Sequence, residues 1–177
     1  SYWLYFVTST NFALARSLVN SMKNEVVCNI AGIEDIVATK LIGYEEAIES
    51  YNKAISVLPN YPDAFNNLGN CFKRLGRLED AIENYEWAVA YKHDFFQAYN
   101  NLGIAQRENQ MLEKSVKSFQ KAVEVNKNYM DAHLNLGIAF IDSGNKEMAK
   151  NSFERVLEID SKNEEAKNHL KTLSAID

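Results

Sequence analysis

The chain has 177 residues, a formal net charge of -5 and an apolar share of 46%. This composition is that of an ordinary folded chain and differs from the low-hydrophobicity, highly charged composition of disordered segments. The acidic balance argues against a general role in binding nucleic acid or anionic membranes, because such a role needs a concentrated positive surface.

Cysteine content and the length of apolar runs indicate the compartment and whether membrane insertion is expected. Two cysteines, Cys28 and Cys71, are too few for a disulfide framework, and no Cys-x-x-Cys pair occurs. We predict that Cys71 is a buried apolar thiol. This usage fits a reducing compartment, so a cytoplasmic location is expected. No apolar run reaches the length that crosses a bilayer, and no secretory signal pattern is present, so no membrane insertion is expected.

Residues 1–43 differ in pattern from the rest of the chain. They open with a short aromatic-rich run over residues 2–7, and two helical patterns follow, the second at about 29–42. The second pattern stands where a repeat array would place the first helix of its first unit. We interpret the segment as a degenerate opening repeat. The alternative is a self-association or docking segment, which the aromatic density favours.

Residues 44–163 carry one pattern that returns at a constant period. A single helix from Tyr44 is followed by three complete helix pairs, at residues 62–95, 96–129 and 130–163. Pro62 is predicted to open a helix, because the missing N–H costs nothing at that position. The recurring residues are Leu68, Leu102 and Leu136; Gly69, Gly103 and Gly137; Ala47, Ala81, Ser115 and Ala149; and Tyr51, Tyr85, Phe119 and Phe153.

The fixed step from Leu68 to Leu102 and on to Leu136, with these residue types, resembles the tetratricopeptide repeat, a helix–turn–helix unit. The resemblance covers roughly residues 44–177. It implies an all-α, right-handed superhelical solenoid in which each unit buries its apolar face against its neighbours. Residues 164–177 are predicted to form a capping helix, because Lys171 stands where a glycine would admit another closely crossed helix.

Small residues are predicted to set the crossing of the two helices within a unit. Gly69 is expected to face Ala81, so that the helices approach closely, with Tyr85 filling the space beside them. A bulky residue in place of Gly69 or Gly103 is expected to overpack the crossing by a few kcal/mol.

The turn between the two helices of a unit needs a residue that tolerates positive φ. Gly76 and Gly144 supply it in the second and fourth repeats. Gln110 replaces this glycine in the third repeat, and the adjacent Asn109 is the candidate substitute.

No residue pattern in the chain is typical of catalysis. The three histidines, His93, His133 and His169, are not spaced as metal ligands on one helix, and His133 is interpreted as a packing residue. No glycine-rich phosphate loop occurs. We therefore expect no enzyme activity, no metal site and no cofactor.

Asparagine recurs immediately before each Leu-Gly pair, as Asn67, Asn101 and Asn135. The resemblance to tetratricopeptide arrays places this position on the concave wall formed by the first (A) helices. A carboxamide offers one acceptor and two donors, so a row of them can hold an extended peptide by its backbone. The Asn-Leu-Gly runs resemble the repeat region of O-linked N-acetylglucosamine transferase, where such a row is known. The alternative is that these asparagines bond a neighbouring helix or cap a turn.

Side chains beside this row are expected to complete a peptide-binding site. They are polar and cationic in the second repeat, mixed in the third and apolar in the fourth, which favours a ligand polar or acidic at one end and apolar at the other. Alternatively, Ile138 and Ile141 face the capping helix. The flanking candidates are Asn66, Asn70, Lys73, Arg74, Asn100, Ile104, Arg107, Leu134 and Ile138.

Co-chaperone repeat domains offer a second comparison. They clamp a C-terminal carboxylate with two asparagines and several cations, and Asn70 and Asn101 match the asparagine positions. Asn66, Asp131 and Asn135 stand where the cations should be, and an acidic residue there repels a carboxylate. This departure argues against a chaperone-tail ligand.

Trp87 replaces the usual polar residue of the second helix in its repeat, with Phe95 and Phe96 further along. An exposed aromatic cluster of this kind marks a dimer or assembly contact. The alternative is local packing of Trp87 against the loop near Tyr61 and Tyr91.

These features together predict a scaffold for protein–protein interaction that binds an extended peptide or helix of a partner protein and does not catalyse a reaction. Two alternatives follow from the same resemblance. In the first alternative, the chain is the substrate-recruiting repeat region of a larger enzyme, such as a glycosyltransferase. In the second, it is a structural subunit of a large assembly. Fold-level resemblance does not choose among these three.

Overall fold

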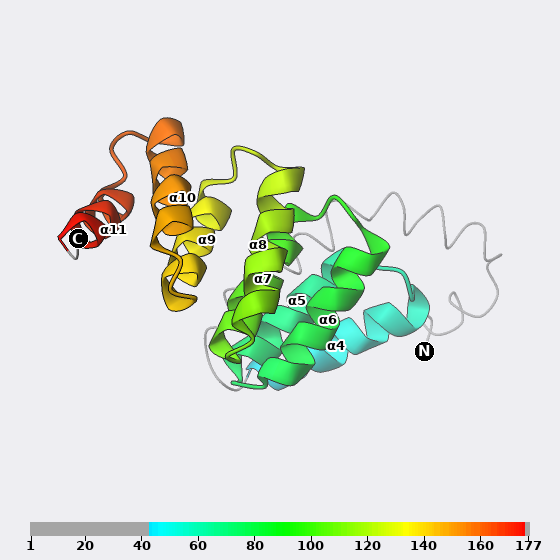
Figure 1. Ribbon diagram of the computed structural model, residues 1–177. Helices are drawn as coiled ribbons and strands as arrows, with labels where there is room; N and C mark the ends of the chain where they lie inside the picture. The colour runs from blue at the N-terminus through cyan, green and yellow to red at the C-terminus, as the bar shows by residue number, and fades with distance from the viewer. Residues whose placement is uncertain (1–42, 176–177) are drawn as a thin grey trace, which may run out of the picture. The chain divides into compact units, whose positions relative to one another are not determined.

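The structure is a computed structural model, and it describes residues 43–175. Every regular element in this range is an α-helix (Figure 1). The predicted segment 1–43, with its helix near 29–42, lies outside the described residues except for Gly43, as do the last two residues of the predicted cap. The helices are α4 (Gly43–Val57), α5 (Pro62–Arg74), α6 (Leu78–Tyr91), α7 (Phe96–Glu108), α8 (Leu112–Val125), α9 (Met130–Asp142), α10 (Lys146–Ile159) and α11 (Glu164–Ser174).

The helices are arranged as a series of antiparallel pairs. The closest partners are α5 with α6, α7 with α8, and α9 with α10, and the second helix of each pair packs against the first helix of the next. The first helices also touch one another, α5 with α7 and α7 with α9, and α11 packs against α10 at the end of the series (Figure 1). The predicted all-α array of helix–turn–helix units is confirmed.

An aromatic ring fills the crossing inside each complete pair. Tyr85, Phe119 and Phe153, which stand at equivalent positions of successive repeats, are all 0% exposed. A Cβ atom built on Gly69 would lie 2.7 Å from Cε1 of Tyr85, so the glycine leaves room for the ring. The prediction that Tyr85 fills the space at this crossing is confirmed, whereas the contact of Gly69 with Ala81 stays a prediction. The ring occupies the space that the missing Cβ leaves.

The apolar core is shared between neighbouring repeats. One cluster joins α4 to α7 through Ile48, Leu68 and Ile82, and a second joins α8 to α11. Cys71 belongs to the first cluster and is 6% exposed, as predicted. No repeat in the described range has a core of its own, which is the usual basis of stability in a repeat array.

The turns between paired helices show why one prediction failed. Gly76 has φ of +73° and Gly144 has φ of +75°, as predicted. In the third repeat Gln110 itself has φ of +59°, whereas Asn109 has φ of -86°, so the proposed substitution by Asn109 is wrong. The hydrogen bond from the Met111 N–H to the Gln106 carbonyl, 2.8 Å long, closes this turn as in the other repeats. That bond sets which residue takes the left-handed conformation, whatever its type.

We expect Gln110→Gly to stabilise the chain by roughly 0.5 kcal/mol. The left-handed conformation costs a non-glycine residue about 1–2 kcal/mol, and the greater chain entropy of unfolded glycine removes part of that gain. Urea denaturation followed by circular dichroism measures the change. The matched variant Gly144→Gln introduces the same strain in the fourth repeat and should lose stability. Equal losses in both variants would contradict the assignment of strain to Gln110.

Candidate functional site

The predicted binding residues lie on three consecutive first helices, α5, α7 and α9. We call the side of these helices that carries Asn67, Asn101 and Asn135 the A-helix face. All three side chains are half-buried, so part of each amide remains at the surface. The contacts of α5 with α7 and of α7 with α9 make this face continuous over three repeats.

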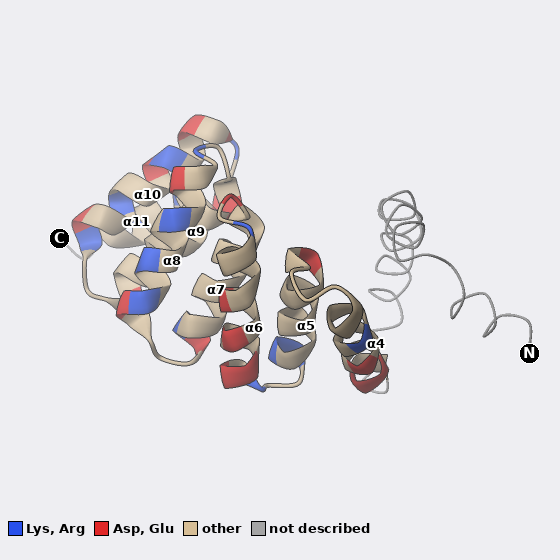
Figure 2. Cartoon of the chain, turned by 90° about the vertical axis from the view of Figure 1, so that its right-hand side faces the viewer, with Lys and Arg blue, Asp and Glu red and all other residues tan. Residues whose placement is uncertain are grey.

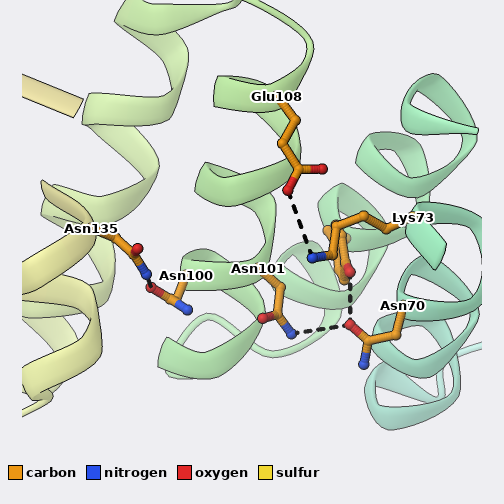
Figure 3. Close-up of polar contacts among 7 residues, drawn as sticks. Asn70, Lys73, Asn100, Asn101, Glu108 and Asn135 are labelled. Carbon is orange, nitrogen blue, oxygen red and sulfur yellow. Dashed lines mark hydrogen bonds and ion pairs between the residues drawn. The ribbon is translucent and has the colours of Figure 1, made fainter. Parts of the chain in front are cut away.

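Two amides of the row form hydrogen bonds to the preceding repeat (Figure 3). Asn101 Nδ2 donates to Asn66 Oδ1 at 3.0 Å and to Asn70 Oδ1 at 3.4 Å. Asn135 Nδ2 donates to Asn100 Oδ1 at 3.0 Å. Asn101 and Asn135 therefore bond a neighbouring helix, as the alternative interpretation of the asparagine row expected, and they link one A helix to the next.

Two of the predicted residues are buried in this structure. Asn66 is 9% exposed and Asn100 is 4% exposed, and both accept the bonds just described. Adjacent positions on an α-helix differ by about 100° around its axis, so Asn66 and Asn100 turn toward the next helix while the residues that follow them do not. In this structure both side chains join repeats, and their predicted role in peptide binding stays a prediction.

The surface amides retain unused hydrogen-bonding atoms. Within residues 43–175, no hydrogen bond uses the Oδ1 atoms of Asn101 and Asn135 or the Nδ2 atoms of Asn67 and Asn70. Asn67 Oδ1 accepts only a long contact of 3.4 Å from Asn66 Nδ2. The A-helix face thus offers acceptors on α7 and α9 and donors on α5, which is the complement of a peptide backbone.

The hydroxyl of Tyr85 completes a polar network in the second repeat. It donates to Asn70 Oδ1 at 2.7 Å, while burial raises the pKa of Tyr85 far above its ordinary value and keeps the phenol protonated. The next repeat has Phe119 instead of tyrosine, and Ile104 stands where Asn70 would be. The hydroxyl of Tyr85 thus has the polar partner Asn70, whereas Phe119, which lacks a hydroxyl, has the apolar Ile104 at the equivalent position. The difference between tyrosine and phenylalanine at this position was the signal that sequence reasoning missed.

Two ion pairs also join neighbouring A helices. Lys73 Nζ lies 4.0 Å from Glu108 Oε1, and Arg107 Nη1 lies 3.7 Å from Asp142 Oδ2. These side chains are partly exposed, so each pair contributes little to stability. Each carboxylate nevertheless reduces the positive charge that its cation presents on the A-helix face.

The shortest amide bonds between repeats and both ion pairs share one spacing that sequence reasoning did not use. Each of these contacts joins residues whose numbers differ by 35. The repeat period is 34 residues, as from Leu68 to Leu102. A spacing of 35 therefore joins each residue to the one that follows its equivalent in the next repeat. The sequence signal is therefore a pair of complementary residues separated by one period plus one.

The remaining predicted residues divide between surface and core. Arg74 is exposed and makes no ion pair with any residue in the described range. Ile104, Leu134 and Ile138 are partly buried and pack against the core cluster that includes Ala166 and Leu173 of α11. Ile138 packs against this shared core, Ile141 is 36% exposed, and α11 packs chiefly against α10, so the alternative that Ile138 and Ile141 face the capping helix stays a prediction.

Trp87 forms a small aromatic cluster on the outer side of α6. Its ring is 46% exposed and stacks on Tyr91, with centroids 5.8 Å apart, and lies 6.3 Å from Phe65. The contact with Tyr91 was predicted and that with Phe65 was not. Phe95 is buried and Phe96 packs edge-on against Tyr129, so neither contributes to an exposed cluster.

The described residues contain no grouping of three or more His, Cys, Asp or Glu side chains suited to a metal ion. His133 Nε2 donates a 3.0 Å hydrogen bond to the Lys127 carbonyl, and burial lowers the pKa of His133 below its ordinary value. His169 stacks on Phe153 at 4.6 Å. In the same part of the chain, none of the helices has the length and apolar character needed to cross a membrane.

Comparison with solved structures places the fold among known repeat proteins. Two crystal structures of MamA, each 23% identical in sequence, match with TM-scores of 0.65 and 0.71 and cover 75% and 82% of this chain and 88% and 81% of their own. The first TPR of Spaghetti (RPAP3), bound to the HSP90 peptide SRMEEVD, is 25% identical, with a TM-score of 0.62, and covers 65% of this chain and 94% of its own. The second TPR domain of human RPAP3, in complex with the HSP70 peptide SGPTIEEVD, is 26% identical, with a TM-score of 0.60, and covers 64% of this chain and 98% of its own.

Comparison with protein families and with curated sequences completes the assignment. No curated protein sequence matches the chain. The narrower resemblance to the repeat region of O-linked N-acetylglucosamine transferase is not shown by these comparisons. A family model described as TPR repeat matches residues 43–76 and 69–110, and one described as tetratricopeptide repeat matches residues 96–129 and 131–163. These matches span most of the chain, and those of the second model coincide with the helix pairs α7–α8 and α9–α10, so the chain belongs to the tetratricopeptide repeat family.

Proposed function

We propose that the chain is a protein-interaction module that holds an extended peptide or helix of a partner protein against the A-helix face. The observation that carries this proposal is the row of surface amides on three consecutive helices, with donors and acceptors that no described residue uses. Family membership supports a role in protein binding. So do two proteins of the same fold, at 25% and 26% identity, that are bound to peptides of HSP90 and HSP70.

The hydrogen bonds between repeats prepare the amides for binding. Asn101 is held by Asn66 and Asn70, and Asn135 is held by Asn100, so their side-chain conformations are set before a ligand arrives. A preset side chain loses less conformational entropy when it binds, which favours affinity. The free acceptor of each amide can then take a backbone N–H of the ligand. Binding, rather than catalysis, is the chemistry that such amides support.

Charge on the A-helix face determines which ligands fit. Lys73 is paired with Glu108 and Arg107 with Asp142. Arg74 has no ion pair among the described residues, so its charge is the one most available to a ligand. We infer that the ligand is polar, with at most a small acidic part, near α5 and more apolar near α9. A terminal carboxylate fits this face poorly, because amides stand at Asn66 and Asn135 where a clamp needs cations.

The proposal is tested with the variant Asn67→Ala/Asn101→Ala/Asn135→Ala. We expect affinity to fall about tenfold or more, because each lost hydrogen bond contributes about 0.5–1.5 kcal/mol. Partners are captured from cell extract by the intact chain, their sequences are synthesised as overlapping peptides, and binding is measured by fluorescence anisotropy. The peptide SRMEEVD serves as a comparison ligand, and we expect it to bind weakly.

A matched variant separates loss of binding from loss of structure. Asn66→Ala/Asn100→Ala breaks the two 3.0 Å hydrogen bonds between repeats from their buried ends but leaves the surface amides in place. We expect it to keep most of the affinity. Equal loss in both variants would refute the backbone-binding role of the row. Arg74→Glu should weaken binding of acidic peptides, and unchanged affinity would contradict the proposed preference along the face.

A further inference from the structure

The outer helix α6 carries an unbalanced negative charge. Its residues include four acidic side chains and no basic one. Asp80 is paired with Arg77 at 2.7 Å, whereas Glu79, Glu83 and Glu86 are exposed and form no ion pair with any residue of the described range. Three carboxylates on one exposed helix surface repel one another, so an opposite charge brought against them is attracted.

The next outer helix, α8, presents lysines at equivalent or adjacent positions. Lys117 stands one repeat period after Glu83, and Lys114 and Lys121 each stand one residue beyond the equivalents of Glu79 and Glu86. Lys121 pairs with Glu124 at 2.8 Å, whereas Lys114 and Lys117 are exposed and have no ion pair in residues 43–175. Figure 2 shows acidic residues along α6 and basic residues on α8, where Glu113 and Glu124 accompany the lysines. No ion pair within 4.0 Å joins these two described helices to each other.

Two complementary surfaces on neighbouring helices are what a symmetric dimer requires. Both α6 and α8 pack against α7, so the acidic and basic surfaces lie one repeat apart. In a two-fold symmetric dimer every contact occurs twice. If surface A of the first copy faces surface B of the second, then surface B of the first copy faces surface A of the second. A two-fold axis between α6 and α8 would therefore place the acids of each copy against the lysines of the other, and both contacts would be attractive.

Exposed aromatic rings beside the acids supply apolar area for the same contact. Trp87 and Tyr91 on α6 are 46% and 44% exposed and stack on each other. Tryptophan and tyrosine are enriched among the residues that dominate binding energy at interfaces. Surface charge pairs alone contribute little, so the rings would supply affinity and the charges would select the orientation.

We propose that the α6–α8 surface, which comprises Glu79, Glu83, Glu86, Trp87 and Tyr91 with Lys114, Lys117 and Lys121, binds a second copy of this chain in a two-fold symmetric dimer. The contact uses none of the residues of the A-helix face, so it stands or fails separately from peptide binding. A second copy is favoured over an unrelated basic partner because the chain itself carries the matching lysines one repeat away.

Sedimentation analysis of the full chain tests the dimer directly. We expect a concentration-dependent dimer in about 0.05 M salt that weakens in about 0.5 M salt, because screening shortens the reach of exposed charges. The acid-reversed variant Glu83→Lys/Glu86→Lys and the base-reversed variant Lys114→Glu/Lys117→Glu should each raise the dimer Kd at least about tenfold, since like charges then meet. Trp87→Ala should weaken the dimer at both salt concentrations.

Mixing the two reversed variants gives the decisive result. Lysines on α6 of one variant would face glutamates on α8 of the other, so a heterodimer should form although neither variant dimerises alone. Lys150→Glu, an exposed change on α10, is the control and should leave the wild-type dimer intact. Circular dichroism confirms that each variant remains folded. A wild-type chain that stays monomeric, reversed variants that still dimerise, or a mixture without heterodimer would each overturn the proposal.

Discussion

Phe119→Ala is expected to lower the free energy of unfolding by about 3–5 kcal/mol, which is a large part of the stability of a small domain. The ring is 0% exposed and lies at the crossing of α7 and α8, in the cluster that continues through α9 and α10 to α11. Its removal takes away apolar contacts and leaves a cavity. Gly103 has no side chain that could move into the space. Urea denaturation followed by circular dichroism measures the loss.

Two further variants control this prediction. Val57→Ala removes apolar atoms from a side chain that is 77% exposed, so it should change stability by less than about 0.5 kcal/mol. Phe119→Tyr keeps the ring but directs a hydroxyl toward the apolar surroundings of the third repeat, where Ile104 replaces Asn70. We expect this variant to lose about 1–3 kcal/mol, because the added hydroxyl has no partner. Wild-type stability in Phe119→Ala would contradict the role given to the aromatic position.

Gly103→Val is expected to destabilise the chain by about 1–3 kcal/mol or more. A Cβ atom at this position would lie 2.6 Å from Cε1 and 2.7 Å from Cδ1 of Phe119. The ring is fully buried and cannot turn away into solvent, so the helices must separate. Valine is a better helix former than glycine, so local propensity favours the substitution, and a loss of stability would measure the overpacking.

Coupling with the ring identifies the cause. In Gly103→Val/Phe119→Leu the smaller side chain leaves room for the added methyl groups, so the two losses should not add. Additive losses would show that the close approach of Gly103 to Phe119 is not the source of the strain. Thermal denaturation of the two single variants and the double variant gives the coupling energy.

Local patterns in the sequence were sufficient for the helices and their turns. The return of Leu68 and Gly69 in each repeat, the placement of Pro62 and the left-handed glycines Gly76 and Gly144 all act within one helix or one turn. Each reflects a local requirement: an apolar stripe, a tolerated missing N–H, or a positive φ. The turn at Gln110 shows the limit, because hydrogen bonds of the turn override the preference of the residue.

The candidate site was predicted only in part, for a physical reason. The sequence places Asn66 and Asn67 side by side and does not tell which of the two a neighbouring helix covers. Stacking of α7 on α5 buries Asn66, leaves Asn67 at the surface and brings Asn101 within 3.0 Å of the buried amide. The same stacking sets Lys73 beside Glu108.

The amino-acid sequence by itself determined the repeat, its period, its helices and the presence of an amide row, because these depend on residue types at fixed spacing along one chain. Only the tertiary structure decided which amides join repeats and which remain free, which cations carry a neighbouring carboxylate, and that Tyr85 reaches Asn70. These outcomes depend on how one helix rotates against the next. A rotation of a single residue position, about 100°, exchanges a buried side chain for an exposed one.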